Sequence, residues 1–257
     1  MALAAVVFDL DDTLFDHSTA ALSGLRTWVR SLGRSSTPEL ESAWAAAEQR
    51  HFASWREGRI GFAEQRRRRL REVLPLLQLP VGEDAELDAL FTGGFLVAYQ
   101  AAWTGFDDVD AALRLVHAAG LRTAVLTNGT REQQNAKIEA IGLRGRLGPV
   151  LTAEELGVAK PRPQAFRAVC EHLRVAPEQT LYVGDDHDVD VLGARAAGLH
   201  AVHLDRGGAA AVQEEDRITS LHELAAHLDR PWPGAVSGPR GGPRPAAPPA
   251  RRPRPGS

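Results

Sequence analysis

The hydrophobic pattern begins with a short apolar run that leads directly into acidic residues. Residues 6–8 (Val-Val-Phe) precede Asp9 and Asp11, a pattern typical of a buried strand followed by a polar loop. From residue 16 to about residue 103, apolar positions recur at helical spacing. We expect helices there near residues 20–32, 38–56, 62–74 and 87–99, the second capped by Thr37 with Pro38 in its first turn. The pattern therefore predicts a helical insertion after the first strand.

From residue 107 onward, predicted helices and strands alternate. The expected strands lie at residues 121–126, 149–151, 180–183 and 200–204, with amphipathic helices between them. Alternation of this kind indicates an α/β fold with a doubly wound parallel sheet covered by helices on both faces.

Polar side chains follow three of these strands at the point where each strand ends. They are Asp9 with Asp11, Thr127 with Asn128, and Asp185, and Lys160 lies in a loop before a helix. The carboxyl ends of parallel strands share one edge of a sheet, so we expect these groups to converge. An isolated Asp-x-Asp pair can simply cap a turn, but paired carboxylates also bind Mg²⁺. A carboxylate nucleophile, a lysine and a metal together suit phosphoryl transfer.

Four ordered motifs resemble those of the haloacid dehalogenase superfamily of phosphohydrolases. They are Asp9-Leu10-Asp11-Asp12-Thr13, Thr127-Asn128-Gly129, Lys160-Pro161, and Gly184-Asp185 with the later Asp190. The resemblance covers about residues 3–228 and implies a discontinuous Rossmann-like catalytic core at residues 1–15 and 105–230. Residues 16–104 match the all-helical cap that one class of the superfamily inserts after its first motif.

The resemblance also assigns roles to the motif residues. Asp9 would be the nucleophile and form an aspartyl-phosphate, and Asp11 would act as general acid and then general base. Lys160 would neutralise charge, while Thr127 and the Asn128 backbone would hold phosphoryl oxygens. Mg²⁺ would bind Asp9, the Asp11 carbonyl and Asp185, and Asp190 would ligate a metal-bound water or hold Lys160. The implied function is Mg²⁺-dependent hydrolysis of a small phosphorylated metabolite.

Related chemistries remain as alternatives. A 2-haloacid dehalogenase has no leaving alkoxide to protonate, so Asp11 argues against that reaction. A phosphonatase of this family needs a cap lysine, and residues 16–104 contain none. A phosphomutase similar to β-phosphoglucomutase shares the same nucleophile and acid/base residue and stays open. A non-catalytic binding protein is the least favoured alternative, because the acidic and lysine residues are all present.

Lysine usage and the arginine-rich helix add further expectations. Lys137 and Lys160 are the only lysines in a chain rich in arginine, which suggests that residue 160 needs a compact ammonium group. Arg66, Arg67, Arg68 and Arg69 are consecutive, so a helix spreads them around its axis, and we expect a solvated cap surface. His17, Arg56 and Arg59 are candidates to contact the part of the substrate beyond the phosphate.

Composition limits the partners and the location. The net charge is −3, with 44% hydrophobic and 25% charged residues, as in ordinary globular proteins, so we expect no nucleic-acid partner. The sequence shows neither a basic leader region nor a membrane span, which favours a cytoplasmic enzyme, either a monomer or a homodimer. Residues 231–257 are rich in Pro and Arg and are expected to be disordered.

Overall fold

The computed structural model describes residues 2–208, 216–229 and 232. The Pro- and Arg-rich tail expected at residues 231–257 lies outside the described residues, apart from Trp232.

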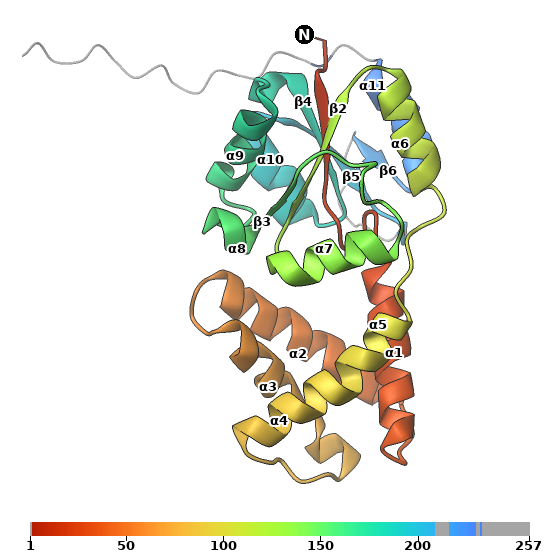
Figure 1. The fold of residues 1–257 in the computed structure, drawn as a ribbon, viewed down its shortest axis with the longest axis vertical. Helices are drawn as coiled ribbons and strands as arrows, with labels where there is room; N and C mark the ends of the chain where they lie inside the picture. Colours follow the sequence, from red (N-terminus) through yellow and green to blue (C-terminus); the bar gives the residue numbers. More distant parts are fainter. Residues whose placement is uncertain (1, 209–215, 230–231, 233–257) are drawn as a thin grey trace, which may run out of the picture.

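A six-stranded parallel sheet in the order β3-β2-β1-β4-β5-β6 forms the centre of the larger lobe (Figure 1). Its strands are β1 (Ala5–Phe8), β2 (Arg122–Thr127), β3 (Val150–Thr152), β4 (Thr180–Gly184), β5 (His200–Leu204) and β6 (Arg217–Ile218). The expected α/β class with a parallel sheet is confirmed. β6 was not expected, because two residues are too few to show an alternating pattern.

Helices cover both faces of the sheet, as the alternation predicted. Val6 and Phe8 of β1 pack on the face covered by α6 (Val109–Ala118) and α7 (Arg131–Ala140). Ala5 and Val7 pack in a separate cluster with α9 (Pro163–Leu173) and α10 (Gly193–Ala196). Side chains alternate between the faces of a strand, so a continuous apolar run at the centre of the sheet supplies both clusters. The shorter elements are α8 (Ala153–Leu156), η3 (Pro177–Gln179), the π-helical η4 (His187–Leu192), η5 (Leu221–Leu224) and α11 (Ala225–Leu228).

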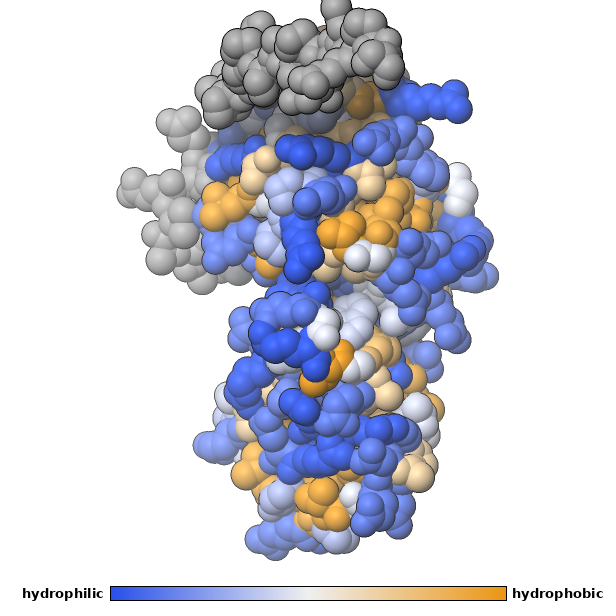
Figure 2. Space-filling view, turned by 90° about the vertical axis from the view of Figure 1, so that its left-hand side faces the viewer, coloured by the Kyte–Doolittle hydropathy of each residue, from blue (hydrophilic) through white to orange (hydrophobic). Residues whose placement is uncertain are grey.

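Residues 16–104 form a helical lobe, called the cap below, on the side of the sheet where the strands end (Figure 1). It contains α1 (His17–Ser31), α2 (Pro38–Arg56), α3 (Phe62–Val73), η1 (Pro75–Leu77), α4 (Asp84–Leu90) and α5 (Leu96–Ala101), with the π-helical η2 (Phe91–Phe95) joining α4 to α5. Thr37 caps α2 by accepting a hydrogen bond from the Leu40 N–H, as expected. Trp44 and Phe95 pack with ring centroids 4.5 Å apart in the centre of this lobe. The face of the cap seen in Figure 2 is mostly hydrophilic, with a few separate apolar areas.

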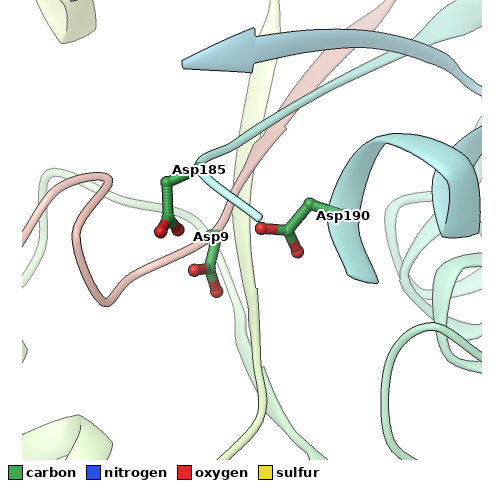
Figure 3. A group of neighbouring side chains, drawn as sticks. All are labelled: Asp9, Asp185 and Asp190. Carbon is green, nitrogen blue, oxygen red and sulfur yellow. The ribbon is translucent and has the colours of Figure 1, made fainter. Parts of the chain in front are cut away.

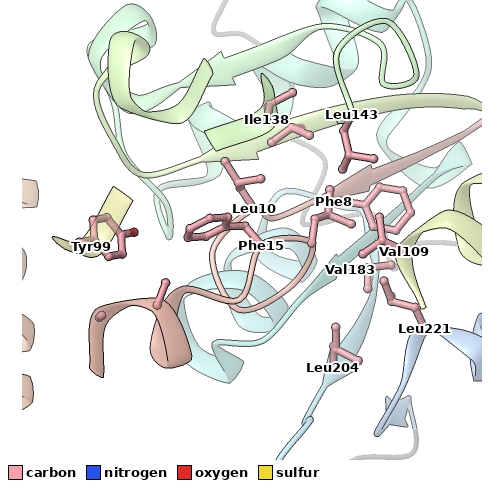
Figure 4. Packing of buried hydrophobic residues seen from close by; sticks show 14 of the residues in the cluster. Phe8, Leu10, Phe15, Tyr99, Val109, Ile138, Leu143, Val183, Leu204 and Leu221 are labelled. Carbon is pink, nitrogen blue, oxygen red and sulfur yellow. The ribbon is translucent and has the colours of Figure 1, made fainter. Parts of the chain in front are cut away.

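The two ends of the cap meet beside the sheet. Phe15 and Gly105 form an isolated antiparallel bridge, and the Asp16 N–H donates to the Thr104 carbonyl at 3.0 Å. Phe15 also contacts Tyr99 and Trp103 edge to face, at centroid distances of 6.3 and 5.8 Å. One apolar cluster therefore runs from the sheet through Phe15 to Tyr99 of α5 (Figure 4). This packing holds the cap next to the carboxyl ends of the strands.

Candidate active site

A tight turn after β1 brings the first two acidic residues into one cavity. The Leu10 carbonyl accepts from the backbone N–H groups of Leu14 and Phe15 at 2.9 Å each. Asp12 adopts a left-handed backbone conformation (φ 56°), which Asp tolerates better than most residues. The chain is therefore turned rather than extended at this point. Asp9 and Asp11 nevertheless both line a cavity of about 140 Å³ at the strand ends, although each has its own set of partners.

Lys160 connects three oxygen atoms beneath that cavity. Its Nζ donates to Asp9 Oδ1 at 2.5 Å, Asp190 Oδ1 at 2.7 Å and the Tyr182 hydroxyl at 2.9 Å. The lysine side chain is 3% exposed. Burial disfavours its charge, but Asp190 and Asp9 outweigh that cost and raise the pKa of Lys160. The ammonium is therefore held in its charged form beside the expected nucleophile.

Asn128 fixes the backbone of Lys160. The Asn128 Oδ1 accepts from the Lys160 N–H at 2.8 Å, and the Asn128 Nδ2 donates to the Lys160 carbonyl at 2.9 Å. Asn128 was expected to contribute through its backbone to phosphate binding. In the structure, its side chain instead joins the loop after β2 to the loop that carries Lys160.

Three carboxylates gather at the same place, and their oxygen atoms lie within 4.8 Å of one another. Asp9, Asp185 and Asp190 come from three segments of the core and direct their oxygens toward a common centre (Figure 3). Burial and the neighbouring carboxylates raise the pKa of both Asp9 and Asp185, because Lys160 offsets only part of this charge. A buried all-oxygen group with excess negative charge fits a hard divalent cation. Asp9 and Asp185 were expected as metal ligands. Asp190 belongs to the same acidic group and also accepts a hydrogen bond from Lys160.

The Asp11 side chain is held by α7. Its Oδ1 accepts from Lys137 Nζ at 2.6 Å, and its Oδ2 accepts from Gln134 Nε2 at 3.1 Å. Gln134 Nε2 also donates to the Thr127 hydroxyl at 2.5 Å, which links Asp11 to the second motif. Burial opposes ionisation of Asp11, but the charges of Lys137 and His17 and these hydrogen bonds outweigh it and lower the pKa of Asp11.

Sequence reasoning missed both Lys137 and Gln134. The scarcity of lysine was used only for residue 160, although it applies equally to residue 137, whose side chain is 3% exposed. The scarcity of lysine was therefore the available signal.

A second cavity of about 250 Å³ adjoins the first and extends between core and cap. The two cavities share a boundary formed by Asp11, Phe52, Arg56, Asn128 and Asp186. Among the candidates for contacting the rest of the substrate, His17 and Arg56 line the cap cavity. Arg59 is exposed and forms an ion pair with Glu57, so the structure does not bring it to the site.

The four consecutive arginines of α3 divide between the surface and this cavity. Arg67 and Arg68 pair with carboxylates on the outside of the cap, as expected. Arg66 and Arg69 line the cap cavity, so the expectation of a solvated surface is wrong for these two. Arg69 is 4% exposed and pairs with Glu48 at 2.9 Å. The register of α3 against the core decides which arginines turn inward, and sequence alone does not show that register.

The fold and this site together define a class of enzymes. A parallel α/β sheet carries a buried carboxylate beside a lysine, next to a group of acidic side chains that suits a divalent cation and beneath a helical cap. A family model described as haloacid dehalogenase-like hydrolase matches residues 3–198 of the chain. The chain therefore belongs to the haloacid dehalogenase-like hydrolases, and the family expected from its motifs is confirmed.

Named relatives agree with this assignment, and a solved structure shares the fold. The chain is 31% identical to a Mycobacterium tuberculosis protein named Phosphatase MT3486, over 91% of this chain and 100% of that protein. It is 40% identical to a phosphoserine phosphatase of Thermus thermophilus, but the match spans only 40% of this chain and 41% of the relative. The fold is similar to that of the HAD-hydrolase YfnB from Bacillus subtilis, with a TM-score of 0.78, 20% identity, and coverage of 90% of this chain and 100% of the other. No helix among the described residues combines the length and apolar character needed to cross a membrane.

Proposed function

We propose that the protein is a Mg²⁺-dependent phosphohydrolase of small phosphorylated metabolites that acts through an aspartyl-phosphate. The observation that carries this proposal is the 2.5 Å contact between Lys160 Nζ and Asp9 Oδ1, at a cavity that Thr127, Asn128 and Asp185 also line. A lysine at this distance favours the ionised, nucleophilic form of the carboxylate. The phosphatase named among the full-length relatives supports the same activity.

The metal would be held by the carboxylates of Asp9, Asp185 and Asp190, with the Asp11 carbonyl as a further ligand. When bound, Mg²⁺ supplies positive charge that offsets the charge of the phosphoryl oxygens. Lys160 adds a second cation on the protein side of Asp9. Thr127 and the Asn128 backbone would hold the remaining phosphoryl oxygens.

In the first step, an Asp9 carboxylate oxygen attacks phosphorus and the ester oxygen leaves with a proton from Asp11. In the second step, Asp11 takes a proton from water as the water oxygen attacks the phosphorus of aspartyl-phosphate. Phosphate leaves and the Asp9 carboxylate is restored, so atoms and charge balance over the cycle. Lys137 and Gln134 orient the Asp11 carboxylate, and Lys137 stabilises the ionised form that the first step produces and the second step requires. The cap excludes bulk water and large substrates from this chemistry.

The test is phosphate release from an aryl phosphate by the purified protein. Mg²⁺ should support release, a chelator should abolish it, and Asp9→Asn should be inactive. Asp188→Asn is a matched control, because the Asp188 side chain lies in η4 and is 86% exposed, so its replacement should leave the rate unchanged. An active Asp9→Asn variant, or no phosphate release from any monoester with Mg²⁺, would contradict the proposal. Isomerised sugar phosphate in place of free phosphate would identify a phosphomutase.

The division into a core at residues 1–15 and 105–230 and a cap at 16–104 is part of this proposal. The cytoplasmic location and the monomeric or homodimeric state stay predictions from the sequence.

A further inference from the structure

The cap cavity holds more positive charge than its own carboxylates balance. Of the basic groups that line it, Lys137 pairs with Asp11, and Arg69 and His17 both pair with Glu48. The two others, Arg56 and Arg66, form no ion pair within the described part of the chain. This leaves two guanidinium groups beside the space next to the phosphate site.

Arg66 differs from its neighbours on the same helix. Arg67, Arg68 and Arg71 all pair with carboxylates of the cap. The Arg66 guanidinium carbon instead lies 4.4 Å from the centroid of Phe62 and 5.0 Å from that of Phe91. Within the described part of the chain, its one polar contact is a long hydrogen bond of 3.4 Å to Gln133 Oε1. The helix thus presents one unpaired arginine to the cavity while it neutralises those on its outer side.

The surroundings of Arg66 favour an anion. Burial, followed by repulsion from Arg69, lowers the pKa of Arg66, and the opposing charges of Asp88 and Glu132 offset only part of this. Aromatic rings contact a guanidinium through its faces, while its N–H donors lie along the edge and fit a carboxylate or phosphate in two-point hydrogen bonding. Arg56 lines both cavities and therefore lies between this position and the phosphate site.

We propose that the substrate is a phosphomonoester that carries a second anionic group, a carboxylate or a second phosphate, bound by Arg66 with Arg56 at the junction of the two cavities. This inference rests on the proposed phosphatase function of the adjoining site. The cap cavity takes the second anion, while the core cavity takes the phosphoryl group that is transferred. A charged hydrogen-bonded pair in such a partly buried place predicts a preference of roughly 10- to 100-fold over a neutral analogue.

Matched substrate pairs test the inference. 3-Phosphoglycerate and glycerol 3-phosphate differ only by a carboxylate in place of a hydroxymethyl group, and ribulose 1,5-bisphosphate and ribulose 5-phosphate differ by one phosphate. We expect kcat/KM to favour the member with the second anion in at least one pair, and the pair concerned identifies the carboxylate or the phosphate as the preferred group. Arg66→Gln should bring the ratio of the two kcat/KM values in that pair close to one. Arg66→Lys should retain part of the preference.

Arg68→Gln is the matched control. Arg68 lies two residues away on α3, pairs with Glu64 and has a side chain that is 45% exposed, so its loss should leave the ratio unchanged. Equal melting temperatures of the two glutamine variants would show that α3 stays folded. A ratio near one in both pairs for the wild-type protein, or a ratio that survives Arg66→Gln, would overturn the anion site and leave the phosphatase function intact.

A binding measurement tests this inference independently of the proposed function. Calorimetric titration of Asp9→Asn protein with the same pairs, in the presence of Mg²⁺, measures the second-anion preference without turnover. If the wild-type protein released no phosphate, a preference that disappears in the Asp9→Asn/Arg66→Gln double variant would still establish the anion site. Equal affinity for both members of each pair would refute it, whatever the activity.

Discussion

Lys137 Nζ lies 2.6 Å from Asp11 Oδ1, which joins a buried lysine of α7 to the acidic residue next to the expected nucleophile. Phe15 lies under the same ammonium, with its ring centroid 4.9 Å from Nζ. Gln134 holds the other Asp11 oxygen and also the Thr127 hydroxyl. The first and second motifs are therefore connected through one face of α7, so this helix positions Asp11, the proposed acid/base residue.

Replacing Lys137 with Met should impair catalysis more than binding. Asp11 would lose the cation that orients it and stabilises its charge, so we expect kcat to fall by about 10²-fold or more, with a smaller change in KM. Steady-state kinetics on an aryl phosphate measures both values. Lys137→Arg retains a cation and should recover part of kcat. A Lys137→Met enzyme with kcat within about twofold of wild type would show that Asp11 does not depend on α7.

Replacing Asn128 with Ala should lower both stability and activity. The variant loses two hydrogen bonds to the Lys160 backbone, at about 1 kcal/mol each, so the free energy of unfolding should fall by about 1–3 kcal/mol. Urea unfolding measures this change. Activity of the folded variant should fall as well, because Lys160 is no longer held at Asp9. Unchanged stability together with lost activity would instead point to a direct role of the side chain in phosphate binding.

Metal binding should stabilise the protein through the acidic group of Asp9, Asp185 and Asp190. Burial and then repulsion within this group raise the pKa of Asp9 and Asp185, and Mg²⁺ would offset the repulsion. A ligand at about 100 times its Kd adds about 2.7 kcal/mol of stability. The melting temperature should therefore rise saturably with Mg²⁺. Asp185→Asn should reduce that rise strongly, whereas the exposed control Asp188→Asn should retain it. An equal rise in the Asp185→Asn protein would exclude this metal position.

His17 should make stability depend on pH near neutrality. Burial disfavours the imidazolium, but Glu48 at 3.8 Å and the Asp11 charge outweigh it and raise the pKa of His17 above 6.5. A raised pKa in the folded state means that this contribution is complete below the unfolded-state pKa and is lost as the pH rises through the folded-state value. The melting temperature of wild type minus that of His17→Asn should therefore decrease between about pH 6 and pH 8. A difference that is constant across this range would show that His17 does not titrate there.

The core part of the site could be predicted from the sequence because parallel strands end at a common edge. That rule placed Asp9 and Asp185 near one another, and the resemblance to the family added Lys160. The structure brings the three residues together. The contacts of Lys137 and Gln134 with Asp11 could not be predicted in the same way. They depend on how α7 is rotated against the sheet, and a helix with mostly polar residues shows no apolar stripe that reveals its buried face.

The cap was harder to interpret for a similar reason. Its helices and the Thr37 cap follow local rules, and these rules hold in the structure. Whether Arg66 or Arg68 turns toward the core depends on contacts between segments far apart in the chain, such as that of Arg66 with Gln133. Local spacing gives each arginine a direction around the helix axis but does not say where the cavity lies.

The most direct test of the central claim is to identify the residue that receives the phosphoryl group. Acid quenching during turnover of an aryl phosphate with Mg²⁺, followed by peptide mass spectrometry, should show a phosphoryl adduct on Asp9 that is absent from Asp9→Asn protein. Borohydride reduction of the quenched enzyme should convert the same residue to homoserine. An adduct at another residue, or steady phosphate release without any adduct on the enzyme, would contradict the account.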